Sequence, residues 1–166
     1  MYLIDTNVLN EVLRAGPNVA VVRTLLNTVP ALRFASEITR YELRFGAMLR
    51  DGGGALWARI EQRILPLVRW LPVDAAVVLA AADLAAMLRR AGQPIEWADG
   101  MLAAMASVHG LTVVTRNVRH FERVPDSRVE NWFPPESGPS VNRRAHASAG
   151  KYRFVLFGYK GRYVCL

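Results

Sequence analysis

Several residue types are scarce in this chain of 166 residues, and each gap excludes a class of protein. Its single cysteine, Cys165, can form neither an internal disulfide nor a cysteine-rich zinc site. No apolar stretch reaches the roughly 18 residues that cross a bilayer, and the N-terminus has no basic and apolar leader sequence. We therefore expect a cytoplasmic protein with no membrane segment.

Charge is also unevenly distributed along the chain. Residues 1–136 contain no lysine, and their 15 arginines nearly balance 14 acidic residues. Residues 137–166 contain six basic residues and no acidic one, so the net charge of +7 belongs mainly to this tail. A basic segment favours polyanionic partners, and here that indication applies to the tail alone.

The change in composition divides the chain into a domain at 1–136 and a basic linker and tail at 137–166. The linker reads SGPSVNRRAHASAG, a composition typical of flexible segments. The last 16 residues, KYRFVLFGYKGRYVCL, predict a small hairpin. Its aromatic residues among basic ones would suit stacking on single-stranded RNA. An ordinary hairpin would have the same composition, and an altered reading frame at the end of the gene could also produce it.

Short apolar segments alternate with helical patterns throughout residues 1–136. We expect strands at 2–4, 33–36, 68–73, 111–115 and 127–131, and helices at 6–14, 18–28, 37–50, 55–65, 75–91 and 97–109. This alternation predicts an α/β fold with a short parallel central sheet flanked by helices. In such sheets, binding sites form at the carboxyl ends of the strands.

Two aspartates stand where an apolar element begins or ends. Asp5 directly follows the buried strand YLI, and Asp99 opens the apolar face of the helix at 97–109. Each has a structural alternative: Asp5, Thr6 or Asn7 would cap the next helix, and a helix N-terminus favours an anion such as Asp99.

Glu42 stands within an apolar stripe of the helix at 37–50. Ile38, Phe45 and Leu49 have the spacing of one helical face, and Glu42 falls inside it. Buried glutamates are rare unless they are paired or bind a cation. A drift of the stripe that leaves Glu42 on its wet edge is the alternative.

Three converging carboxylates favour a hard divalent cation, because Mg²⁺ prefers oxygen ligands and removes their mutual repulsion. Such a cation suits phosphodiester hydrolysis. The sequence has no phosphate-binding G-x-x-x-x-G-K-[ST] loop and no G-x-S-x-G motif. We expect its histidines, His109, His120 and His146, to be isolated residues at the surface or at helix ends.

Four segments together resemble the PIN-domain ribonucleases, and most closely the VapC-type toxins of type II toxin–antitoxin pairs. They are MYLIDTNVLNEVLR, ASEITRYELRFG, PIEWADGMLAAMA and LTVVTRNVRHF, and the resemblance covers about residues 1–133. It implies a PIN fold, Mg²⁺- or Mn²⁺-dependent cleavage of RNA, a homodimer, and inhibition by a cognate antitoxin.

The resemblance also implies roles for individual residues. The metal-binding and catalytic acids would be Asp5, Glu42 and Asp99, and the supporting or substrate-binding residues would be Thr6, Asn7, Thr115, Arg116 and Asn117. At His120 family members often have a fourth acid, so this departure leaves a second metal ion in doubt. A catalytically inactive module that binds RNA or protein, and a housekeeping RNA-maturation nuclease, remain as alternatives.

Overall fold

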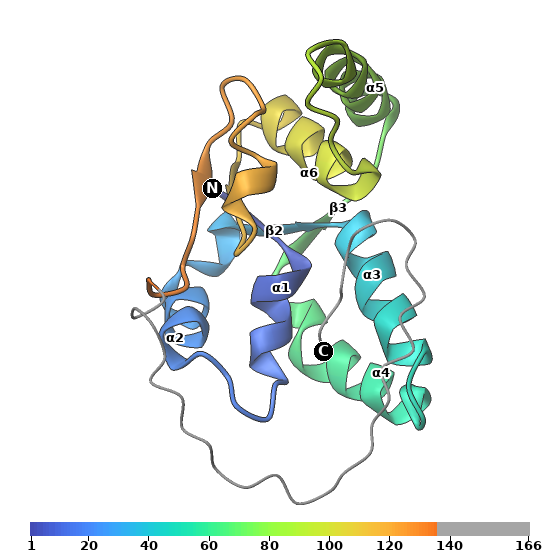
Figure 1. The fold of residues 1–166 in the computed structure, drawn as a ribbon. Coiled ribbons are helices and arrows are strands. Elements are labelled where there is room, and N and C mark those ends of the chain that lie inside the picture. The colour runs from blue at the N-terminus through green and yellow to red at the C-terminus, as the bar shows by residue number, and fades with distance from the viewer. Residues whose placement is uncertain (136–166) are drawn as a thin grey trace, which may run out of the picture.

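A parallel sheet of five short strands forms the centre of the protein (Figure 1). The computed structural model describes residues 1–135, so the expected linker and hairpin, and the boundary at residue 136, lie outside the described part. The strands are β1 (Tyr2–Ile4), β2 (Arg33–Ser36), β3 (Arg69–Leu71), β4 (Thr112–Val114) and β5 (Val129–Glu130). Their order is β3-β2-β1-β4-β5, and every neighbouring pair is parallel, which confirms the predicted fold class.

Helices connect the strands much as the sequence predicts. They are α1 (Thr6–Leu9), α2 (Val19–Asn27), α3 (Glu37–Met48), α4 (Gly53–Arg63), α5 (Ala75–Arg90) and α6 (Trp97–Val108). The predicted helix at 6–14 is shorter than expected, because α1 continues as a 3₁₀ turn over Asn10–Val12. None of the helices within residues 1–135 is long and apolar enough to cross a membrane.

Polar side chains fix where several helices begin. Ser36 accepts a hydrogen bond from the backbone N–H of Ile38 at the start of α3, and Asp74 accepts one from Val77 in α5. Because a cap satisfies a backbone donor that the helix itself leaves open, the starting points of these helices are encoded locally.

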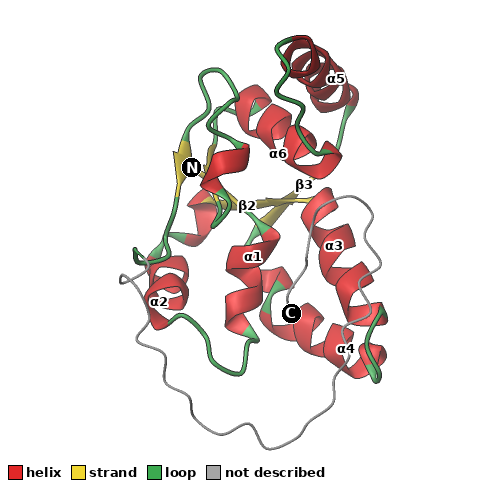
Figure 2. Ribbon diagram, in the orientation of Figure 1, coloured by secondary structure: helices red, strands yellow, loops and turns green. Residues whose placement is uncertain are grey.

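Helices cover both faces of the sheet (Figure 2). Alternating side chains of the strands belong to two separate apolar cores, one on each face. Leu3 packs with residues of α5 and α6 on one face of the sheet. Its neighbour Ile4 packs with residues of α1 to α4 on the other. Successive side chains of a strand point to opposite faces, so these two residues, each fully buried, anchor β1 between the layers.

The central strand β1 has its next element in sequence, β2, on one side and the much later β4 on the other. The strand order therefore reverses between β1 and β4, which is where open α/β sheets form their sites. A backbone hydrogen bond of 3.0 Å from Asp5 to Val114 extends this pairing past the last residue of β1. The side chains that follow β1 and β4 are thus brought to one edge.

Candidate active site

Asp5 lies at that edge, where β1 ends, with only 2% of its surface exposed. Its Oδ1 accepts a hydrogen bond from the backbone N–H of Thr6 (2.6 Å), so Asp5 caps α1. Of the three cap candidates in the sequence, Asp5 is therefore the correct one. Thr6 and Asn7 are not caps, because both already belong to the first turn of α1. Oδ2 accepts bonds from Asn7 Nδ2 and from the hydroxyl of Thr115, each at 2.7 Å. The Asp5 carboxylate thus caps α1 with Oδ1 and binds Asn7 and Thr115 with Oδ2.

Thr115 links the end of β4 to the start of α1. Its fully buried hydroxyl donates to Asp5 and accepts from Asn7 Nδ2 and from the backbone N–H of Asn117, each at 3.0 Å. One donor and two acceptor positions are all that a hydroxyl has, so the three bonds fix its orientation. The backbone N–H of Arg116 donates to Asn7 Oδ1 (3.1 Å), which holds the following loop against α1.

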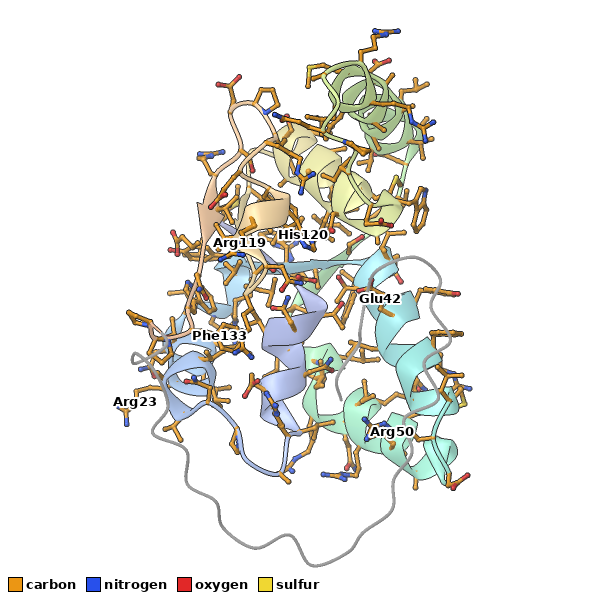
Figure 3. The ribbon with its side chains drawn as sticks, viewed as in Figure 1. Arg23, Glu42, Arg50, Arg119, His120 and Phe133 are labelled. Atoms are coloured by element: carbon orange, nitrogen blue, oxygen red, sulfur yellow. The ribbon has the colours of Figure 1, made fainter. Side chains whose placement is uncertain are left out.

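Glu42 reaches the same edge from α3, and Thr6 connects it to Asp5. The hydroxyl of Thr6 donates to Glu42 Oε2, while the backbone of Thr6 donates to Asp5. In Figure 3, Glu42 lies beside the N-terminal end of α1. The Glu42 side chain is half-buried rather than enclosed, so a ligand can approach it.

The predicted inward stripe of α3 is wrong. Phe45 and Leu49 are 49% and 69% exposed, and the buried residues of the helix are Thr39, Leu43, Gly46 and Ala47. Both sets have helical spacing, but small residues let α3 approach its neighbours closely and leave the bulkier ones outside. Glu42 therefore stands at the edge of the packed face, the alternative considered from the sequence.

Asp99 enters the site from the first turn of α6 and is fully buried. The apolar face that it opens is buried as predicted, with Leu102, Ala103 and Ala106 each at most 6% exposed. Because α3 packs against both α1 and α6, the helices that carry Glu42 and Asp99 are direct neighbours.

His120 contacts Asp99, which contradicts the expectation that this histidine is isolated. Its Nδ1 lies 2.8 Å from Asp99 Oδ2, and its side chain is 37% exposed. In Figure 3, His120 lies above the N-terminal end of α1, in the 3₁₀ turn Val118–His120. A buried aspartate needs a hydrogen-bond donor. The inward position of Asp99 was therefore the sequence feature that could have indicated this contact. His109, by contrast, ends α6 as its C-cap, as expected.

The donor set fits a hard divalent cation by its chemistry. Asp5, Glu42 and Asp99 offer carboxylate oxygens, the ligands that Mg²⁺ and Mn²⁺ favour. Within residues 1–135, no three or more His, Cys, Asp and Glu side chains form a group that could hold a metal ion as they stand. The structure therefore presents Asp5 and Glu42 joined through Thr6, and Asp99 joined to His120, rather than a closed cage.

Comparisons with known proteins agree with this architecture. The PIN domain family matches residues 2–127. Toxin FitB of Neisseria gonorrhoeae is 41% identical over 126 residues, which are 73% of this chain and 91% of FitB. The tRNA(fMet)-specific endonuclease VapC of Salmonella typhimurium is 34% identical over 131 residues, 79% of this chain and 97% of that protein.

A solved structure gives the same result in three dimensions. The crystal structure of FitAcB from Neisseria gonorrhoeae matches with a TM-score of 0.73 at 40% sequence identity, over 80% of this chain and 98% of that chain. The resemblance that four sequence segments indicated is confirmed, and the chain belongs to the PIN-domain family, among its VapC-type members.

Proposed function

We propose that the protein is a metal-dependent endoribonuclease and the toxin of a toxin–antitoxin pair, with Asp5, Glu42 and Asp99 as its metal-binding acids. One observation carries the proposal most directly. The end of β1 brings Asp5 to Thr115, the residue after β4, and, through Thr6, to Glu42 of α3. Relatives that are named as a toxin and as an endonuclease support this function, and a cognate antitoxin is its expected protein partner.

The supporting residues hold the acids in place before RNA binds. Thr6 fixes Glu42 relative to Asp5, and Thr115 with Asn7 fixes the Asp5 carboxylate. Such supporting contacts orient metal ligands and tune their affinity. The backbone of Asn117 is bonded to Thr115, and we expect Asn117 and the exposed Arg116 to orient ligands or contact the substrate.

Bound Mg²⁺ or Mn²⁺ would supply a Lewis acid for the phosphate and activate a water for attack on phosphorus. The carboxylates alone would repel the RNA backbone, so the ion and nearby cations are needed for approach. We expect Arg116 to contact the RNA backbone. The Asp99 carboxylate, bonded to His120 on one oxygen, would use the other toward the ion.

Purified full-length protein tests this function on a panel of structured RNAs with Mg²⁺, with Mn²⁺ and with EDTA. We expect cleavage that requires metal and is lost in Asp5→Asn. Asp83→Asn is the matched control, because Asp83 is an exposed aspartate on α5, remote from the site. Cleavage that persists in EDTA, or in the Asp5 variant at the control's rate, would exclude the proposed mechanism. The homodimer remains a separate prediction that light scattering can test.

A further inference from the structure

A groove of about 910 Å³ opens beside the candidate active site. Three segments far apart in sequence form it: residues 11–18 around the start of α2, residues 116–122 after β4, and residues 131–135 after β5. Asn117 and His120 line the groove and also contact the site residues Thr115 and Asp99. The groove is therefore continuous with the carboxylates rather than a separate hollow.

The two sides of this groove carry different charges. On the side of residues 11–18, Glu11 forms an ion pair with Arg14 at 2.8 Å and accepts a hydrogen bond of 2.6 Å from the backbone of Asn18. Opposite them, Arg116 and Arg119 are exposed on the loop that leads out of β4. One side of the groove is thus nearly neutral, and the other carries two exposed arginines and one exposed acid, Glu122.

An aromatic ring completes the lining. Phe133 is half-buried, and the guanidinium of Arg116 lies 5.2 Å from the centre of its ring. Figure 3 shows Arg119 next to His120, and Phe133 further along, toward α2. Cations followed by an aromatic face are the features on which single-stranded nucleic acids bind, because every base has a flat surface that can stack.

We propose that this groove binds the single-stranded RNA that continues from the cleaved phosphate, with Arg119 on the backbone and Phe133 beneath a base. The inference rests on the proposed ribonuclease function and adds the path of its substrate. A strand that leaves the carboxylates past His120 meets Arg119 first and Phe133 later. The neutral Glu11–Arg14 side gives the strand room without repelling it.

The test measures binding of a fluorescent single-stranded RNA of mixed sequence to the full chain, in EDTA so that no cleavage occurs. The dissociation constant is measured over a series of salt concentrations for the wild type, Arg119→Ala, Phe133→Ala and Arg90→Ala. Arg90 is the matched control, because it is an exposed arginine at the end of α5, on the other side of the sheet.

Each variant has its own expected signature. Arg119→Ala should weaken binding about three- to tenfold and reduce the slope of log K against log salt by about 0.7, the value for one phosphate contact on a single strand. Phe133→Ala should weaken binding roughly fivefold or more and leave the slope unchanged, since stacking releases no counterions. Arg90→Ala should match the wild type.

Because Phe133 also packs against the core, Phe133→Leu and a thermal melt accompany the alanine variant. Wild-type affinity and slope in both Arg119→Ala and a folded Phe133 variant would overturn the inference and leave the groove to a protein partner. If such variants still cleave RNA, the ribonuclease function stands and only the groove fails. If the wild type cleaves nothing but the binding signatures appear, the groove stands and the nuclease proposal fails.

Discussion

Two buried aspartates belong to the candidate site, and their surroundings differ. Asp5 is bonded to Thr6, Asn7 and Thr115, and the Thr115 hydroxyl is itself fully buried. Asp99 is bonded to His120, whose ring is 37% exposed and lines the groove. The Asp5 side is part of the frame that joins β1, β4 and α1, whereas the Asp99 side is open to whatever enters the groove. We therefore expect a change of Thr115, the partner of Asp5, to affect mainly stability, and a change of His120, the partner of Asp99, to affect mainly function.

The largest effect should come from the aspartate on the open side. Asp99→Asn keeps the shape and removes the charge, and we expect RNA cleavage to fall by about 100-fold or more, the upper end of what supporting contacts alone cost. Cleavage assays with Mg²⁺ and Mn²⁺ measure this loss against the surface control Asp83→Asn. Activity in Asp99→Asn that equals the control's would mean that Asp99 serves only to hold His120.

Metal affinity should distinguish His120 from a surface residue. His120→Ala removes the contact with Asp99, and we expect the affinity for Mn²⁺ to fall roughly tenfold, as for other partners of metal ligands. Titration calorimetry of the full chain gives the affinity independently of cleavage. His120→Asn retains a side-chain donor and should recover part of the loss; equal affinities in all three proteins would remove His120 from the site.

The free energy of unfolding should depend more on the partner of Asp5 than on the partner of Asp99. Thr115→Val leaves Asp5 Oδ2, Asn7 Nδ2 and the Asn117 N–H without the hydroxyl that they share, so we expect the free energy of unfolding to fall by about 1–3 kcal/mol. His120→Ala, at a partly exposed position, should change it by less than about 1 kcal/mol. Urea unfolding measures both. A larger loss for His120→Ala than for Thr115→Val would reverse the comparison.

A smaller loss of cleavage than that of Asp99→Asn should come from changing the bridge between Asp5 and Glu42. Thr6→Val keeps the size of the side chain and removes the hydroxyl that donates to Glu42, so we expect cleavage to fall by about tenfold. Thr6→Ser restores the hydroxyl and should restore most of the rate. If serine behaves like valine, the methyl group rather than the hydrogen bond accounts for the effect.

The sequence contained the positions of the acids but not all of their contacts. Asp5 and Thr115 end adjacent parallel strands, and strand ends are encoded by short apolar runs that are easy to recognise. The face of α3 was mispredicted, because Ile38, Phe45 and Leu49 fit helical spacing as well as the residues that are in fact buried. Only the packing of α3 on its neighbours distinguishes the two sets.

Contacts between distant segments were harder to foresee. His120 and Asp99 are 21 residues apart and meet because a 3₁₀ turn follows β4 beside the start of α6. The groove depends on three such segments at once, so no local pattern predicts it. The composition of residues 116–119 indicated cations, but not that Phe133 would lie among them.

The place of β1 in the middle of the sheet has a consequence for how the protein is made. Asp5 is synthesised more than a hundred residues before its partner Thr115 and the neighbouring strand β4. Until β4 pairs with β1, the Asp5 carboxylate lacks the hydrogen bond from Thr115 and the neighbouring strand that helps to bury it. A nascent chain therefore carries Asp5, Glu42 and Asp99 before the candidate site can form, and that site is complete only after β4 has been synthesised.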